Sequence, residues 1–366
     1  MMASPSAIEV IAITTKVQEK FPLLRDTRRF ARKNSVFNKR SVYFAKVCLF
    51  LISEMNVSMD TGYEIRDDAE HPASRILFPA SLIGILAFLL LFPPFLVSQV
   101  STGAERTDAY FPLLKGKRIG IVANNASVVG HVNTVDLLVK EGIKIERIFS
   151  PEHGFRSEAE AGQIIGNSID PVTGIPVVSL YGSKKKPGVA DMKAIDLVVF
   201  DIQDVGVRFY TYISTLTYVM EACAENKVPL ILLDRPNPNG FYIDGPVLKK
   251  KYASFVGMHP VPVVYGMTIG EYACMVNGEG WLKKRVKCDL KVIPIANYTH
   301  ETRCDLPAKP SPNLPNINAI YLYPSLCFFE GTIVSIGRGT SFPFEVIGHP
   351  GMKQGNFSFT PRSLPG

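Results

Sequence analysis

The stretch IERIFSPEHG, residues 145–154, decides the fold and indicates where the site lies. Its first part, Ile145 to Ser150, is a mostly apolar run with the length of a buried strand. In a parallel α/β sheet, ligands bind outside the carboxyl ends of the strands, and the residues that follow Ser150 lie at such an end. A glutamate on a turn there, beside a glycine that loosens the backbone, has the carboxyl chemistry that general acid catalysis requires. We therefore expect Glu152 to be the catalytic residue.

The sequence from Lys117 onward alternates short β-branched runs with helical patterns. This alternation is typical of βαβ units and predicts a parallel sheet. The predicted strands are Arg118 to Ala123, Ile145 to Ser150, Ile175 to Leu180, Asp196 to Asp201 and Val228 to Leu233. The predicted helices are Thr134 to Glu141 and Phe209 to Asn226. The fold class is therefore α/β, and we place a Rossmann-like parallel-sheet domain at residues 111–245.

The amino-acid composition changes in residues 246–366, which are rich in proline and aromatic residues. They contain one predicted helix, about Thr268 to Trp281, and a predicted strand near Leu290 to Ile295. We interpret them as a smaller auxiliary α+β domain. Because no terminal helix pattern follows the run Phe342 to Ile347, we expect this domain to be C-terminally truncated.

Polar residues follow each predicted strand of the first domain. The clusters are Asn124 with Asn125, Glu152 with His153, Tyr181 with Gly182, Asp201 with Gln203 and Asp204, and Asp234 to Asn237. The carboxyl ends of parallel strands share one edge of a sheet, so these clusters should converge there. A single cleft at that edge is the economical prediction.

The net charge of +7 belongs mostly to the N-terminal part of the 366 residues. Residues 1–58 contain 10 Lys or Arg against 4 Asp or Glu, which leaves 30 against 29 of the totals of 40 and 33 for the remainder. We therefore expect no basic surface on the main body that would neutralise phosphates, and no nucleic acid as a partner.

An uncharged apolar segment runs from Ile76 to Val97 and is followed by small and polar residues up to Ala104. Its unbroken apolar centre resembles the h-region of a secretory signal, so we interpret residues 76–104 as a signal peptide with cleavage near Ala104. The alternative is an uncleaved membrane anchor, because the segment is just long enough to cross a bilayer. Both interpretations predict an exported protein, periplasmic or extracellular, that meets a membrane only through this segment.

The basic stretch before that segment, residues 1–75, receives no function. Export signals normally lie at the start of a protein, so we expect residues 1–54 to come from an over-extended reading frame. Met55 and Met59 both offer a more natural start. A basic juxtamembrane tail is the competing interpretation.

The six cysteines include no CxxC pair, so no zinc or redox motif is visible. Cys288 and Cys304 could form a disulfide in an oxidising compartment. A metal site built from His131, His153 and Asp201 has no ligand spacing to support it. We therefore expect neither a metal nor a cofactor.

A series of short motifs follows in order between Phe111 and Gly366. They are GIVANN (120–125), FSPEHGFR (149–156), DIQDVGVRFYTY (201–212), DRPNP (234–238), GEGW (278–281), PSPNLP (310–315), YPS (323–325) and GRGT (337–340). Together they resemble the bacterial YbbC family, formerly a domain of unknown function, whose characterised members are exo-β-N-acetylmuramidases of the NamZ type.

The resemblance implies a Rossmann-like domain, a smaller auxiliary domain and a cleft between them. It also implies a glycoside hydrolase that removes terminal N-acetylmuramic acid from the non-reducing end of peptidoglycan-derived saccharides during cell-wall turnover and recycling. The family's proposed catalytic acid falls in the Pro-Glu-His-Gly motif, which is Glu152 in this sequence.

Glycoside hydrolysis usually requires a second carboxylate, about 5–5.5 Å from the acid for retention of configuration or about 6.5–9.5 Å for inversion. Asp201 is the best candidate from its position in the chain, and Asp204, Glu158 and Glu160 follow. His153 could orient Glu152 or bond the sugar, and the alternative for a single loop histidine is a structural role.

N-acetylmuramic acid carries a lactyl carboxylate, so a selective site needs a fixed cation, for which the planar fork of arginine is suited. Four arginines stand in motif turns, and we expect at most two to touch ligand while the others pair with Asp201 or Asp234. The candidate substrate-binding residues are Asn124, Asn125, Arg156, Gln203, Arg208, Tyr210, Asp234, Arg235, Asn237 and Arg338.

Two other classes of protein compete with a glycosidase. A non-catalytic binding protein for cell-wall saccharides would share the cleft and the arginines but release no sugar. A dinucleotide-dependent oxidoreductase is disfavoured, because residues 123–130, ANNASVVG, do not form the GxGxxG turn that lets backbone approach a pyrophosphate.

Overall fold

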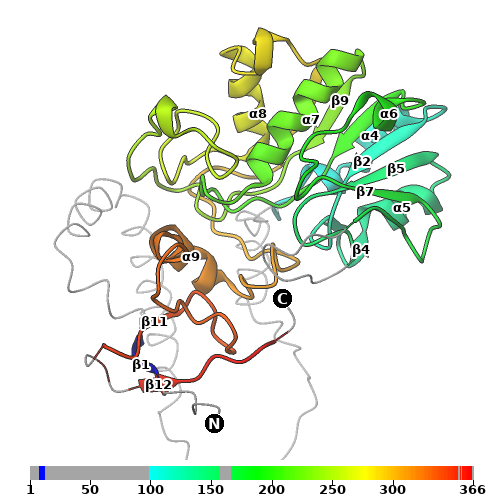
Figure 1. Ribbon diagram of the computed structural model, residues 1–366. Helices are drawn as coiled ribbons and strands as arrows, with labels where there is room; N and C mark the ends of the chain where they lie inside the picture. Colours follow the sequence, from blue (N-terminus) through cyan, green and yellow to red (C-terminus); the bar gives the residue numbers. More distant parts are fainter. Residues whose placement is uncertain (1–7, 13–98, 157–165, 353–354, 356, 365–366) are drawn as a thin grey trace, which may run out of the picture. The chain divides into compact units, whose positions relative to one another are not determined.

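The computed structural model of the protein describes residues 8–12, 99–156, 166–352, 355 and 357–364 (Figure 1). Its main feature is a sheet of seven strands in the order β10-β9-β8-β2-β5-β7-β6. The parallel strands are β2 (Ile119–Val122), β5 (Ile145–Ser150), β7 (Pro176–Ser179), β8 (Leu197–Phe200), β9 (Leu230–Leu233) and β10 (Leu290–Ile293). The edge strand β6 (Ser168–Ile169) is antiparallel to β7. The predicted α/β parallel sheet is confirmed.

The order of the six parallel strands is the doubly wound one. From β7 to β10 they occur in the chain order 3-2-1-4-5-6, which is the Rossmann order. The order reverses between β2 and β8, where residues 119–122 pair with residues 197–200. Ligands of such sheets bind at the carboxyl ends beside this switch point. The loops after β2, β5 and β8 are therefore placed where the sequence predicted a cleft.

Helices cover both faces of this sheet (Figure 1). Because side chains alternate along a strand, Val198 and Phe200 of β8 face one core while Leu197 and Val199 face the other. The first core also contains residues of α7 (Tyr212–Asn226) and α8 (Ile269–Gly278). The second contains residues of α4 (Thr107–Leu114) and α5 (Thr134–Lys140). Burial on both sides explains why these strands are continuous apolar runs.

The remaining elements are short. The helices are α6 (Val189–Met192) and α9 (Ile317–Leu326), and the 3-10 turns are η4 (Gly103–Glu105), η5 (Lys250–Tyr252), η6 (Lys283–Arg285) and η7 (Cys327–Phe329). Strands β3 (Val128–Val129) and β4 (Val132–Asn133) form a hairpin, and β1 (Ile8–Ala12) pairs with β11 (Val346–Gly348) and β12 (Phe357–Phe359) in a small antiparallel sheet. Helix starts carry the expected caps: Asn133 accepts from Val135 N at 3.0 Å, and Thr268 and Glu271 form a capping box.

Strand β10 and helix α8 lie beyond residue 245, where the sequence placed the auxiliary domain. In the structure β10 pairs with β9, and α8 packs in the same core as α7. The main sheet therefore includes residues well past 245. The part that follows α9 contributes Ile336 and Phe344 to this core as well.

The segment just before η4 belongs to the fold. Ser101 and Ala296 exchange two backbone hydrogen bonds, and Gly103 N donates to Asp234 O at 2.7 Å. Ala104 is fully buried, and its carbonyl accepts from the Tyr110 hydroxyl at 2.9 Å. Cleavage near Ala104 would remove these contacts, so that expectation does not fit the structure.

Residues 76–98 of the predicted signal or anchor, and the basic extension at residues 1–75 except for β1, lie outside the described residues. Within the part of the chain that is described, no helix has both the length and the apolar character needed to span a membrane. The sequence left open a disulfide between Cys288 and Cys304. In the structure both are free thiols, and Cys288 is hydrogen-bonded to Cys223.

Candidate active site

A cavity of about 570 Å³ lies at the carboxyl edge of the main sheet. One part of its wall comes from the loops after β5 and β7 and from the start of α7, and another comes from the chain around and after α9. The lining residues are Glu152, His153, Tyr181, Phe209, Tyr210, Thr211, Tyr212, Phe255, Val256, Ser311, Asn313, Leu314, Tyr323, Cys327, Glu330, Gly331, Arg338 and Phe344. Its volume is within the range of about 300–1,000 Å³ for small-molecule sites.

Glu152 is held in this cavity by the turn that follows β5. His153 adopts the left-handed conformation with φ 73°, which is uncommon for a residue with a side chain, and Gly154 follows with φ 83°. Thr211 Oγ1 donates to Glu152 Oε2 at 3.3 Å, and the Tyr181 hydroxyl is also hydrogen-bonded to Glu152. Burial, together with the charge of Glu152, raises the pKa of Tyr181 to about 12. Tyr181 therefore stays protonated as a donor to the carboxylate.

Two tyrosines at the start of α7 join the cavity to the loop after β2. The rings of Tyr210 and Tyr212 meet edge to face at 4.7 Å. Tyr210 donates to Pro310 O at 2.7 Å, and Tyr212 Oη accepts from Asn124 Nδ2 at 3.1 Å. Burial raises the pKa of both hydroxyls well above 10. These tyrosines are thus fixed neutral hydrogen-bonding groups beside Glu152.

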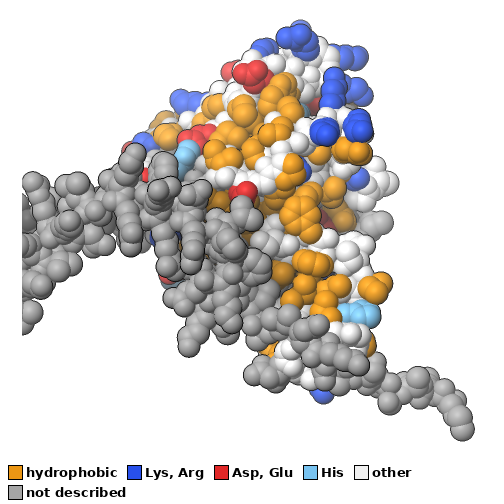
Figure 2. All heavy atoms as spheres, turned by 90° about the vertical axis from the view of Figure 1, so that its left-hand side faces the viewer, with side chains coloured by type: hydrophobic (Ala, Val, Ile, Leu, Met, Phe, Trp, Pro, Cys, Tyr) orange, Lys and Arg blue, Asp and Glu red, His pale blue; other side chains and the backbone are white. Residues whose placement is uncertain are grey.

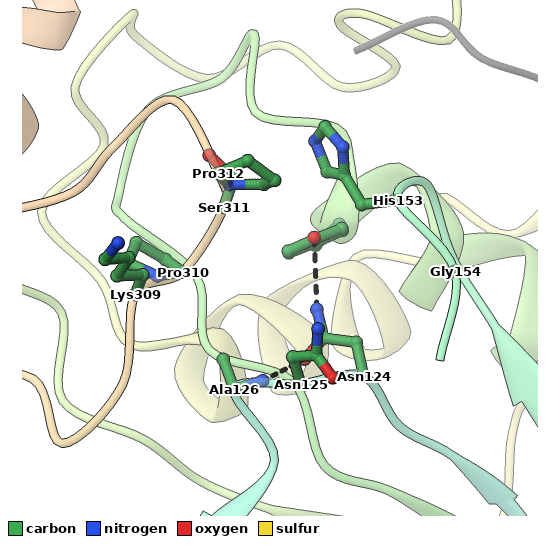
Figure 3. Close-up of a pocket in the computed structure, with 10 residues that line it drawn as sticks. Asn124, Asn125, Ala126, His153, Gly154, Lys309, Pro310, Ser311 and Pro312 are labelled. Carbon is green, nitrogen blue, oxygen red and sulfur yellow. Dashed lines mark hydrogen bonds between the residues drawn. The ribbon is translucent and has the colours of Figure 1, made fainter. Parts of the chain in front are cut away.

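A second, smaller cavity of about 40 Å³ adjoins the first and shares three of its lining residues, His153, Tyr212 and Ser311. Figure 3 shows Asn124, Asn125 and His153 on one side of it and Lys309 to Pro312 on the other. Asn124 Oδ1 accepts from Ala126 N at 2.9 Å, so this side chain is held by bonds at both ends. The space is enough for ordered water rather than a sugar ring.

Glu330 and Arg338 lie in the part of the wall that follows α9. Arg338 donates through its terminal nitrogen to Glu330 Oε2 at 2.5 Å, and its guanidinium lies 5.4 Å from the centre of the Phe344 ring. Burial raises the pKa of Glu330, Arg338 opposes that shift, and the charge of Glu152 adds to it. Glu152 and Glu330 therefore influence each other electrostatically within one cavity.

Asp201, the expected second carboxylate, does not line either cavity. It is fully buried and forms a two-bond ion pair with Arg235, whose Nε and terminal nitrogen donate at 2.6 and 3.0 Å. Thr134 Oγ1 donates to the same carboxylate at 2.6 Å, and Arg235 also donates to Val128 O at 2.9 Å. The pair joins the end of β8 to the loops after β2 and β9. The structure therefore does not bring Asp201 or Arg235 to the described cavities, where the sequence analysis expected them.

Two further arginines are also used inside the protein. Arg156 forms ion pairs with Asp136 at 2.5 Å and Asp170 at 2.6 Å. Arg208 is buried and donates to the carbonyls of Pro246 and Val261. Of the four arginines in motif turns, Arg338 alone lines the described cavities.

The other predicted residues of the loops after β8 and β9 bond to backbone. Gln203 donates to Pro236 O at 2.7 Å, and Asn237 donates to Met267 O at 2.8 Å. Asp234 accepts from Gly270 N and from Thr268 Oγ1, both at 2.8 Å, and so anchors the start of α8. None of the three lines a described cavity, and we assign them to the support of the site.

The structure adds residues that the sequence did not indicate, chiefly Glu330, Thr211 and Phe255. One feature of the sequence could have indicated Glu330: it is the only acidic residue between Asp305 and Glu345, and it precedes Arg338 by eight positions. No group of three His, Cys, Asp or Glu side chains in the described ranges could hold a metal ion.

The long loop between β9 and α8 contributes Phe255 and Val256 to the cavity wall. Tyr218 stacks on Phe255 with ring centres 6.1 Å apart, and Lys185 Nζ lies 4.5 Å from the centre of the same ring. Figure 2 shows hydrophobic side chains gathered on one face of the molecule, with lysine and arginine side chains along part of its edge. Lys185 thus places a positive charge over an aromatic ring of the cavity wall.

Fold and site together define a Rossmann-like α/β protein with a largely aromatic cavity, whose described lining residues include two carboxylates and one guanidinium. Residues 119–318 match the family model described as exo-beta-N-acetylmuramidase NamZ, N-terminal, and residues 321–366 match the corresponding C-terminal model. The chain belongs to the NamZ family, as the sequence motifs predicted.

The known proteins that this chain resembles agree with that assignment. It is 46% identical over 274 residues to the peptidoglycan beta-N-acetylmuramidase NamZ of Bacillus subtilis strain 168, which covers 73% of this chain and 65% of that protein. The chain thus spans slightly less than two thirds of the length of this relative.

Two solved structures, both DUF1343 family proteins from Bacteroides fragilis, have similar folds. One is 54% identical with a TM-score of 0.67, covering 73% of this chain and 72% of the other. The second is 37% identical with a TM-score of 0.62, covering 67% of this chain and 64% of the other.

Proposed function

We propose that this protein is an exo-acting glycoside hydrolase that releases terminal N-acetylmuramic acid from the non-reducing end of peptidoglycan-derived saccharides, in cell-wall turnover and recycling. The proposal is supported by membership of the NamZ family. The observation that carries it is the placement of Glu152 in a cavity at the carboxyl edge of the sheet, bonded by Thr211 and Tyr181.

In this mechanism Glu152 donates a proton to the glycosidic oxygen as the bond from that oxygen to the anomeric carbon breaks. Thr211 and Tyr181 fix the carboxyl group in one orientation, which general acid catalysis requires because the proton must meet the leaving oxygen. The cavity has room for a sugar at the end of a chain rather than for a long glycan strand, which agrees with exo action.

Recognition of the muramyl group falls to Arg338. It is the only lysine or arginine among the described residues that line the main cavity. One guanidinium has five N–H donors, so Arg338 can hold Glu330 and still bond the lactyl carboxylate. Tyr210 and the aromatic residues of the wall supply faces for the pyranose ring.

The test is hydrolysis of 4-nitrophenyl N-acetyl-β-D-muramide and of a muramyl disaccharide. Glu152→Gln should lower turnover of the muramyl disaccharide, whose sugar leaving group needs protonation, by about 10²–10⁴-fold. Glu301→Gln changes an exposed glutamate outside the cavity and should leave turnover unchanged. A folded Glu152→Gln protein with wild-type turnover contradicts the mechanism. A wild-type protein that binds the disaccharide without releasing sugar is the non-catalytic binding protein instead.

We also propose that the protein is exported, periplasmic or extracellular, and either cleaved or anchored through the segment Ile76 to Val97. The support is the composition of that segment. Because Ser101 to Ala104 make contacts within the fold, we expect any cleavage to lie before Ser101. Amino-terminal sequencing of the protein recovered outside the cytoplasm tests this, and recovery of only the full-length chain from the cytoplasm contradicts it.

A further inference from the structure

Resting on the proposed hydrolysis, we propose that Glu330 is the second carboxylate of the reaction, acting from the wall of the cavity that follows α9. Glu152 and Glu330 are the only carboxylates among the described residues that line the main cavity. Asp201, Asp204 and Asp234 are buried and bonded inside the protein, and the candidates Glu158 and Glu160 lie outside the described residues. Reaction at an anomeric carbon usually requires two carboxylates, and the described residues of this cavity include two.

The two glutamates reach the cavity from separate parts of the chain. Glu152 follows β5, and Glu330 follows η7, so a sugar in the cavity is bordered by a carboxylate from each. Of the Glu330 side chain, 33% is exposed, which leaves it accessible to a bound ligand. Its location therefore allows contact with substrate, unlike that of Asp201.

Arg338 holds Glu330 in place. The ion pair at 2.5 Å uses Glu330 Oε2, so Oε1 remains for a water molecule or a sugar hydroxyl. The ion pair uses one terminal nitrogen of Arg338. A guanidinium has N–H donors on two terminal nitrogens, so Arg338 keeps donor capacity for the carboxylate of the substrate while it fixes Glu330.

The environment of Glu330 suits a general base. Burial raises the pKa of Glu330, so this carboxylate binds a proton more firmly than a solvated glutamate does. Arg338 opposes the shift and favours the ionised form that can accept a proton. A base whose pKa lies nearer to neutral pH is more effective.

The step balances with one water molecule. Glu152 gives its proton to the leaving oxygen as the bond between that oxygen and the anomeric carbon breaks. The water oxygen forms the new bond to this carbon, and Glu330 takes the proton that the water loses. A proton then passes from Glu330 to solvent and one returns to Glu152 before the next turnover.

The experiment compares Glu330→Gln, Glu330→Ala and the matched control Glu301→Gln on 4-nitrophenyl N-acetyl-β-D-muramide. Glu330→Gln can keep a hydrogen bond to Arg338, and its fold is checked by circular dichroism. We expect kcat to fall by about 10²–10⁴-fold with a smaller change in KM, and Glu301→Gln to match wild type. Azide added to Glu330→Ala should restore turnover and yield the α-muramyl azide, because azide enters from the face opposite the leaving group.

Two results would overturn the inference while leaving the proposed function intact. One is a Glu330→Gln protein with kcat near that of wild type, since Glu152 would then act without this carboxylate. The other is a loss of activity in Glu330→Ala that azide does not relieve, since Glu330 would then only support Arg338. Absence of hydrolysis by the wild-type protein would instead refute the proposed function itself.

Discussion

The buried pair of Asp201 and Arg235 allows a direct test of whether Asp201 supports the fold or takes part in the chemistry. Asp201→Asn keeps the size of the side chain but leaves the guanidinium of Arg235 without its counter-charge. Both side chains are fully buried, and two hydrogen bonds of 2.6 and 3.0 Å join them. Removal of one partner from such a pair costs about 3–5 kcal/mol, because a buried charge is left uncompensated. With a urea m-value of about 2–3 kcal/mol/M for a protein of this size, the unfolding midpoint should fall by about 1–2.5 M.

Fluorescence of the single tryptophan can follow the urea transition, because Trp281 stacks on His259 with ring centres 5.3 Å apart. Asp196→Asn is the control, since it breaks an ion pair with Arg118 at the surface and should shift the midpoint far less. In the double variant Asp201→Asn/Arg235→Gln, the loss should be smaller than the sum of the two single losses. An unchanged midpoint in Asp201→Asn together with lost turnover would refute the structural role and restore Asp201 as a catalytic candidate.

Three further predictions concern pH, selectivity and packing. Burial raises the pKa of Asp204 from 3.8 to about 6. The Asp204 carboxyl therefore makes its full contribution to stability when the pH is below its pKa in the unfolded protein, and this contribution is lost as pH rises through 6. In Asp204→Asn the Tm should therefore fall less between pH 4 and pH 7 than in wild type, and parallel Tm profiles would contradict this. Arg338→Gln should reduce the preference for muramyl over glucosaminyl substrates by about 10- to 150-fold, the value of one charge-assisted hydrogen bond. Arg338→Lys should retain part of this preference. If the ratio of kcat/KM for the two substrates is the same in the wild type and in both variants, Arg338 is not the selective cation. Gly103→Ala places a Cβ against the backbone of Ile293 and Asp234 and should lower the free energy of unfolding in urea by about 1–3 kcal/mol, whereas Gly116→Ala adds a Cβ in open space and reports only the strain of its positive φ.

The main sheet could be predicted because each of its buried strands is a short, continuous apolar run in the sequence. Ile145–Ser150 was expected from its apolar run and has the same bounds in the structure, since both of its faces are buried. Helix α7 begins three residues later than expected, at Tyr212, because Tyr210 N bonds to Val207 O in a turn before it. Helical periodicity shows that a helix exists, whereas its first residue depends on local bonds.

The site was predicted only in part, and the reason is the direction in which side chains point. Glu152 and Asp201 both follow buried strands, so the sequence pattern alone does not show which of them faces the cavity. Arg235, which neutralises Asp201, comes 34 positions later in the chain, and no local pattern shows that the two meet. Glu330 was missed for the converse reason, because it follows η7 rather than a predicted strand and reaches the cavity through long-range packing. Arg156 was also predicted to bind substrate, but it pairs with Asp170, whose side chain is fully buried.

The cavity wall is assembled from both segments that the family models match, since Glu152 lies in residues 119–318 and Glu330 in residues 321–366. On the proposed mechanism, a nascent chain that has already formed its large sheet holds a proton donor but no partner for it. Hydrolytic capacity would then arise only when the segment that follows α9 has folded against the sheet.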